Sequence, residues 1–182
     1  VGSEMCIRDR YKQCCQPMAD VMKFEDANFL QYVLRVIPRK RYADLPDSRV
    51  DPAAVAHVAM EWNHNGDAKE VTALLEPWFA KGRPLGDKHG LMFDMLMDAY
   101  LQLGQERKRE SLLERMMSNG NRALRAVALQ RRATMLTDRG QVNEAWRVFL
   151  EAQRENPDDP AIGLLEVTLL VSRGDIQQAR DR

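Results

Sequence analysis

The chain has 182 residues, of which 45% are hydrophobic and 30% are charged. This composition excludes an intrinsically disordered chain, and the length allows one ordinary domain or about four to five stacked helix pairs. Lysine plus arginine equals aspartate plus glutamate, 27 against 27, so no global charge attracts the chain to nucleic acid or to an anionic membrane. The longest apolar stretch, residues 161–171, is shorter than the roughly 20 residues that span a bilayer, which predicts that no membrane span is present.

The first ten residues, VGSEMCIRDR, resemble the translated read-through of a sequencing adapter. We interpret residues 1–13 as a non-native start and leave them out of the fold prediction. The native start is then hidden, so a missing leader sequence says little about localisation. The three cysteines, with Cys14 next to Cys15, give neither a disulfide framework nor a zinc spacing. A reducing compartment such as the cytoplasm is favoured, and the periplasm stays open.

Residues 14–50 are predicted to contain one helix and one loop. The apolar pattern predicts a helix over 26–37 that ends before Pro38, and the basic, proline-containing residues 39–50 are predicted to be a loop. We interpret this segment as the remnant of a preceding repeat.

From residue 51 onwards, local signals for helix starts and turns recur. Asp51-Pro52 and Asp159-Pro160 place a capping carboxylate before a proline at the first helical position, which predicts two helix starts. A glycine is expected to end the first helix of each pair at Gly66, Gly104, Gly140 and Gly174. Asp67 with Glu70 predicts a capping-box variant, Asp175 predicts a second cap, and Pro157 is expected to close the helix that starts at Val142.

The apolar residues between these signals keep a helical period, and no segment alternates with period two. Short turns require neighbouring helices to be antiparallel, so we predict an all-α array of helix pairs over residues 51–182, with an irregular linker at 81–90. The pairs are expected at about 51–82, 88–119, 121–157 and 159–182, the last one truncated. Gly140 and Gly174 are 34 residues apart, as are Ala145 and Ala179, which indicates an internal repeat.

The unit over residues 126–159 resembles the tetratricopeptide repeat. Its large, small, turn and closing positions are occupied by Leu129, Ala133, Leu136, Gly140, Ala145, Phe149, Ala152 and Pro157. The unit after it is a truncated copy, and the two earlier pairs are similar in outline only. Arg132 stands where the family usually has leucine, and Arg109 stands where an earlier pair should have alanine. The resemblance implies a right-handed superhelical solenoid whose alanines let the helices approach closely.

The same resemblance implies a concave groove lined by the first helix of each pair. It would contain Met60, Asn63, His64, Asp94, Asp98, Gln102, Gln130, Thr134, Asp138, Leu164 and Thr168. Ala56 and Met60 stand where some family members have the lysine and asparagine that clamp a C-terminal carboxylate. The expected function is a protein interaction scaffold that holds a peptide or a partner subunit in this groove. A groove that only faces solvent or a neighbouring domain is the plainer alternative.

Three further groups of residues contain side chains that could bind a ligand or fill the core. His57, Glu61 and His64 share one helix face with a spacing that could hold a metal, but a fourth ligand is missing, and we favour a solvated face without metal. Basic residues at 107–109, 125, 132 and 139 could form a nucleic-acid patch, but they alternate with glutamates, which favours salt-bridged helices and no nucleic acid. The methionines at 92, 95, 97, 116 and 117 are expected in the core.

No catalytic motif or phosphate-binding glycine loop is present in the sequence, so we expect neither catalysis nor a cofactor. An alternative is that the chain is the non-catalytic arm of a larger enzyme, such as a sulfotransferase or glycosyltransferase. The truncated last pair is expected to leave Leu165 and Leu169 partly exposed, which predicts self-association through the C-terminal repeat.

Overall fold

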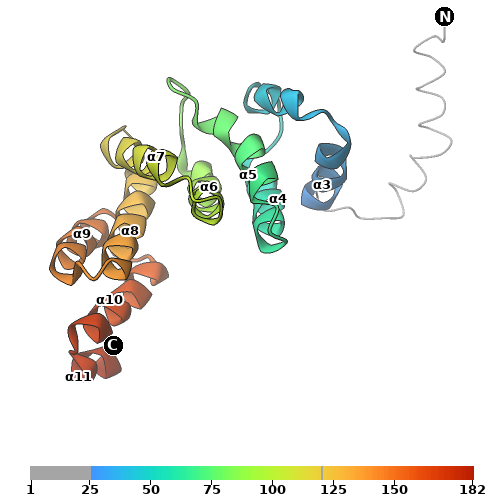
Figure 1. Cartoon of the computed structure of the whole chain (residues 1–182). Helices are drawn as coiled ribbons and strands as arrows, with labels where there is room; N and C mark the ends of the chain where they lie inside the picture. Colours follow the sequence, from blue (N-terminus) through green and yellow to red (C-terminus); the bar gives the residue numbers. More distant parts are fainter. Residues whose placement is uncertain (1–25, 120) are drawn as a thin grey trace, which may run out of the picture.

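The computed structural model describes residues 26–119 and 121–182 (Figure 1). Every regular element in these residues is a helix, and they contain no strand, so the prediction of an all-α fold is confirmed. None of the described helices is both long and apolar enough to cross a bilayer. The predicted non-native start and all three cysteines lie outside the described residues.

Nine α-helices and three short 3-10 helices follow one another in these residues. The α-helices are α3 (Asp26–Val36), α4 (Pro52–His64), α5 (Ala68–Leu75), α6 (Gly90–Gln102), α7 (Glu106–Asn119), α8 (Arg122–Asp138), α9 (Val142–Glu155), α10 (Pro160–Arg173) and α11 (Ile176–Asp181). The 3-10 helices are η2 (Arg39–Asp47), η3 (Glu76–Phe79) and η4 (Asp87–His89).

The predicted starts of α4 and α10 are confirmed. The Asp51 carboxylate accepts a hydrogen bond from the Ala53 amide at 3.3 Å, and the Asp159 carboxylate accepts one from the Ala161 amide at 2.9 Å. The prolines that follow occupy the first helical position, where the missing N–H removes no helical hydrogen bond.

The predicted glycine turns are confirmed as well. Gly66, Gly104, Gly140 and Gly174 have φ values of +82°, +65°, +74° and +83°. Residues with a Cβ rarely adopt this left-handed conformation, which explains why glycine separates the two helices of each pair.

Asp67 and Asp175 occupy the predicted N-cap positions, but the predicted capping by their side chains is wrong. Neither side chain accepts a capping hydrogen bond, because the ψ angles of 42° and 55° depart from the extended backbone found at Asp51 and Asp159. The Asp67 amide instead donates to the Trp62 carbonyl at 2.8 Å and closes the turn. Glu70, the expected second half of the capping box, forms an ion pair with Arg39.

The segment predicted as a loop over residues 39–50 is mostly ordered as η2. Two of its side chains are buried, Tyr42 at 3% exposure and Leu45 at 9%, and the Tyr42 hydroxyl donates to the Leu34 carbonyl at 2.8 Å. These contacts order a segment whose polar composition predicted a loop. The predicted linker over 81–90 is irregular except for the single turn η4.

The helices pack as successive pairs. Each of α4, α6, α8 and α10 packs against the helix that follows it, and each second helix of a pair packs against the first helix of the next. First helices also pack against first helices, α4 against α6, α6 against α8 and α8 against α10. Figure 1 shows this succession from α4 to α11, with α3 before it.

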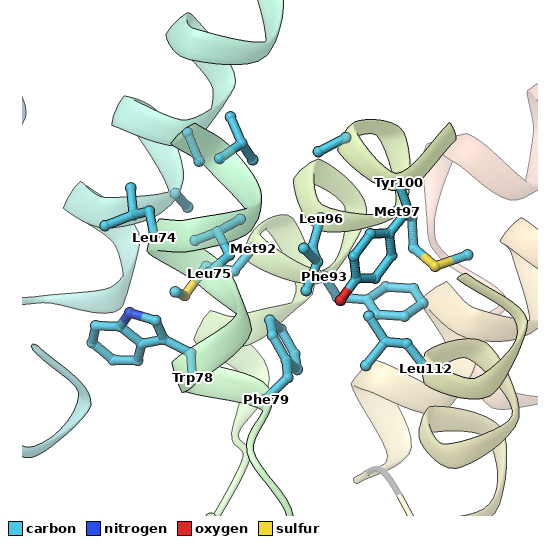
Figure 2. Close-up of a cluster of buried hydrophobic side chains, with 14 of the residues drawn as sticks. Leu74, Leu75, Trp78, Phe79, Met92, Phe93, Leu96, Met97, Tyr100 and Leu112 are labelled. Carbon is cyan, nitrogen blue, oxygen red and sulfur yellow. The ribbon is translucent and has the colours of Figure 1, made fainter. Parts of the chain in front are cut away.

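Two apolar clusters fill the interior. The larger one runs from α3 to α8 and includes the buried residues of Figure 2, and the smaller one joins α8, α9 and α10. Ala133, Ala145 and Ala152 are completely buried in the smaller cluster beside Phe149. Of the predicted core methionines, Met92, Met97 and Met116 are buried, while Met95 and Met117 are half-buried against the clusters.

The prediction that Leu165 and Leu169 are partly exposed is wrong, because they are only 8% and 0% exposed. Both residues belong to the smaller cluster, and α10 is covered by α8, α9 and α11. The exposed apolar residues of this region are Leu164, Val171 and Ile176 instead.

The buried alanine in α9 supplies a test of the packing. Ala145 is 0% exposed, so we expect Ala145→Trp to overpack the α8–α9 contact and to lower the free energy of unfolding by about 1–3 kcal/mol. Urea denaturation of Asn143→Trp, an exposed position on the same helix, supplies the control. Equal stability of the two variants would contradict this packing.

A buried arginine supplies a second test. Arg109 is 9% exposed, its Nε atom has no partner among the described residues, and Glu106 lies 3.4 Å from the guanidinium. We expect Arg109→Met to raise the stability by about 1 kcal/mol, or roughly 3 °C in Tm, because the aliphatic packing remains and a buried Nε–H group without a partner is removed. Calorimetry of Arg107→Met, at an exposed position, is the control. A marked fall in Tm for Arg109→Met would show that the charge is required.

Candidate functional site

A hollow of about 440 Å³ lies across α6, α8 and α10, the first helices of three successive pairs. Its walls consist of Asp94, Gln130, Arg131, Thr134, Thr137, Asp138, Ala161, Leu164, Leu165 and Thr168. Six of the predicted groove residues are therefore brought together, namely Asp94, Gln130, Thr134, Asp138, Leu164 and Thr168.

Arg131 holds the wall of this hollow together on the α6 side. Its guanidinium lies between two carboxylates of α6, with Nε 2.6 Å from Asp94 Oδ1 and Nη1 2.9 Å from Asp98 Oδ1. All three side chains are only partly exposed, at 27%, 29% and 35%. Asp94 and Asp98, both predicted to line the groove, therefore share one arginine that the prediction did not include, and it compensates one of their two negative charges.

Burial and charge act against each other in this cluster. Burial raises the pKa of the Asp94 carboxyl above its ordinary value, and the carboxylates of Asp98 and Asp159 add to this, while Arg131 partly opposes it. Burial also tends to lower the pKa of Arg131, but its two carboxylate partners raise it above the ordinary value. Arg131 therefore stays protonated, and it partly offsets the effect of burial on Asp94.

Gln130 and Asp159 fix the register between α8 and α10. The Gln130 amide donates to Asp159 Oδ2 at 2.9 Å, while Oδ1 of the same carboxylate caps α10. Gln130 thus has a structural partner in addition to its place in the hollow.

The remaining wall is open to a ligand. Leu164 is 72% exposed beside the exposed Ala161. The hydroxyls of Thr134 and Thr168 donate to carbonyls of their own helices, which leaves the hydroxyl oxygens able to accept. Asp138 is exposed and has no ion pair within the described part of the chain. The hollow thus presents an apolar surface, hydroxyl groups and one free carboxylate.

The other predicted groove residues lie outside this hollow. Asn63 donates to the Met95 carbonyl at 2.8 Å and joins α4 to α6, so it is half-buried between these helices. Asp98 pairs with Arg131, and Met60, His64 and Gln102 are exposed.

None of the candidate metal-binding or nucleic-acid-binding residues lines this hollow. Over residues 26–119 and 121–182 no group of three or more histidine, cysteine, aspartate or glutamate side chains is arranged to hold a metal ion. Arg139 pairs with Glu110 at 2.9 Å, and Arg125 pairs with Glu155 at 3.4 Å. These two ion pairs join different helices, whereas Arg109 pairs with Glu106 within α7, as the sequence favoured.

Comparisons of the chain with protein-family models, with curated proteins and with solved structures give no match. The resemblance of residues 126–159 to the tetratricopeptide repeat therefore stays a prediction from its own residues.

The Asp94–Arg131 pair predicts a pH-dependent loss of stability. In Arg131→Met the pKa of Asp94 should rise further, because burial remains and the attraction of the guanidinium is lost. A carboxyl group whose pKa is higher in the folded than in the unfolded state stabilises the folded state fully at a pH below its unfolded-state pKa. This stabilisation is lost as the pH rises through the folded-state pKa. We therefore expect the substitution to destabilise the protein by about 2 kcal/mol at pH 7 and by less at pH 4.

Urea denaturation at both pH values checks this expectation. Arg147→Met, an exposed arginine on α9, is the matched control and should have a small effect that does not depend on pH. If Arg131→Met is equally destabilising at both pH values, Asp94 does not depend on this pair.

Proposed function

We propose that this chain is a protein interaction scaffold of the tetratricopeptide-repeat type, and that the hollow across α6, α8 and α10 holds an extended segment of a partner protein. The observation that carries the proposal is the composition of this hollow, which is built by three successive first helices and leaves Leu164 and Asp138 exposed and without partners in the described residues.

The packing of the helices supports the repeat type. In a solenoid each helix pair contacts its neighbours through both of its helices, and this is the pattern of contacts from α4 to α11. The buried alanines of α8 and α9 also agree with the small positions of the repeat. Arg109 is buried where the repeat would have alanine, so α7 departs from the repeat pattern at this position.

The chemistry of the hollow favours holding a ligand over transforming it. Its volume is in the usual range for ligand sites, and its walls contain no histidine, cysteine or serine. Asp94 and Asp98 both form ion pairs with Arg131, so none of the three is a free acid or base. The ligand that fits has an apolar side chain for Leu164 and Ala161 and polar groups that reach the threonines.

Substitutions on the open wall test this proposal. Peptides would be selected from a displayed random library on the wild-type protein, and their affinities measured by fluorescence polarisation. We expect Leu164→Lys and Asp138→Lys each to weaken the selected peptides at least tenfold, because one introduces a charge at the apolar contact and the other reverses a charge.

Leu150→Lys is the matched control, because Leu150 is an exposed leucine at 37% on α9, outside the hollow. It should bind the peptides as the wild type does. Substituting both Asp94 and Asp98 by arginine would not test the hollow cleanly, because the two new arginines would lie beside Arg131 and repel it. If the selected peptides bind Leu164→Lys and Asp138→Lys with wild-type affinity, the hollow is not the binding site.

A further inference from the structure

A second hollow, of about 420 Å³, lies between η3, α6 and α7, away from the proposed peptide site. Its walls consist of Glu76, Phe79, Tyr100, Arg107, Lys108, Ser111, Leu112 and Arg115. Of the three elements, only α6 also contributes to the first hollow. The two hollows have no wall residue in common.

The apolar residues form the floor of this hollow. Phe79, Tyr100 and Leu112 are only 4%, 5% and 6% exposed, and Figure 2 shows them side by side, with the Tyr100 hydroxyl directed toward the side of Phe79. The Tyr100 hydroxyl donates to Glu76 at 3.1 Å. A packed floor of this kind gives the polar groups above it a fixed base.

The charges around the floor do not balance. Glu76 is the single carboxylate among the wall residues, and it forms an ion pair with Lys108 at 2.8 Å. Arg115 is half-buried and donates to the Phe79 carbonyl at 2.5 Å, without an ion pair among the described residues. Arg107 is exposed and has no ion pair there either. Three cations therefore face one carboxylate, which leaves two positive charges uncompensated.

The two uncompensated arginines are placed on one face of α7 with a hydroxyl between them. Ser111 lies four residues after Arg107 and four before Arg115, so the three side chains follow one another along one face of the helix. Two guanidinium groups and a hydroxyl can together offer several N–H and O–H donors to one oxyanion.

We propose that this hollow binds a phosphoryl group. A phosphate carries about −1.5 to −2 charges at pH 7, which matches the two uncompensated arginines, whereas a single carboxylate would neutralise only one of them. Guanidinium groups also match phosphate geometry, because each can bind two of its oxygens at once. The phosphoryl group can belong to free phosphate or to a phosphorylated side chain of a partner.

Nuclear magnetic resonance of the arginine side chains tests this site. Inorganic phosphate would be titrated into the full chain at constant ionic strength, and the Nε resonances of Arg107 and Arg115 would be followed. We expect both to shift in a saturable way, together with the Ser111 amide, while Arg147 on α9 stays unchanged. Linear shifts of all exposed arginines would mean screening alone and would overturn the proposal.

A capped peptide with one phosphoserine distinguishes the two sources. Binding at least tenfold tighter than inorganic phosphate assigns the site to a phosphorylated protein segment, and equal or weaker binding assigns it to free phosphate. The absence of saturable shifts with either probe would overturn the proposal.

Ser111→Glu supplies the decisive variant. The new carboxylate would lie four residues from each arginine and occupy the site, so we expect phosphate binding to be lost and Tm to rise. Ser118→Glu, at an exposed position of α7 outside the hollow, should bind phosphate as the wild type does. The double variant Arg107→Gln with Arg115→Gln should weaken binding at least tenfold. If Ser111→Glu binds phosphate with the same saturation curve as the wild type, the proposed site is wrong. This outcome is decisive even if the arginine substitutions impair folding.

Discussion

Close approach of helices at buried alanines is the constraint on which the rest of this structure depends. Ala133 on α8 and Ala145 on α9 have no exposed surface, and this leaves room for Phe149 and its neighbours to fill the space between the helices. A helix pair of this size cannot bury its apolar residues by itself, because one face of each helix remains uncovered. The next pair covers that face. α8 accordingly contributes to both apolar clusters, one shared with the preceding helices and one with the following helices.

The surfaces available for binding are what this stacking leaves uncovered. On the first helices, the side that does not face a neighbour carries the hollow with Leu164 and Asp138. The helices beneath it are joined by polar contacts, since Arg131 connects α8 to α6 and Gln130 connects α8 to Asp159 at the start of α10. These contacts fix the distances between the walls, so a ligand would meet a surface that is formed before it binds.

The sequence predicted those features that depend on neighbouring residues. Asp51 and Asp159 cap their helices because the proline that follows already fixes a helical start. Glycine is the residue that readily adopts the left-handed turn, as at Gly140 and Gly174. The hydrophobic period likewise predicted the helices, and the resemblance to the tetratricopeptide repeat predicted six of the residues that line the hollow. The capping hydrogen bond predicted for the Asp67 side chain is absent although the residue pattern is suitable, because the turn after Gly66 sets a different backbone conformation.

The features that could not be predicted depend on residues far apart in the chain. The partners of Arg131 lie on α6, more than thirty residues away, so its position on α8 did not reveal them. Leu165 and Leu169 are buried because neighbouring helices cover α10, which the truncated pattern did not show. Tyr42 orders its segment through a bond to Leu34 on another element. The signal for Arg131 was present only indirectly, since two aspartates one turn apart on a half-buried face require a cation nearby.

The net charge of the whole chain is zero, but the two hollows have local charges of opposite sign. Asp138 gives the peptide hollow a free negative charge, and Arg107 and Arg115 give the second hollow two free positive charges. At physiological ionic strength the interaction between exposed charges is largely screened beyond about 8 Å, so a ligand responds to the charges of the hollow it enters and hardly to the sum over the protein. A net charge of zero, with 27 cations against 27 anions, therefore excludes only a global attraction. The selectivity of each hollow depends on which of its own charges lack a partner.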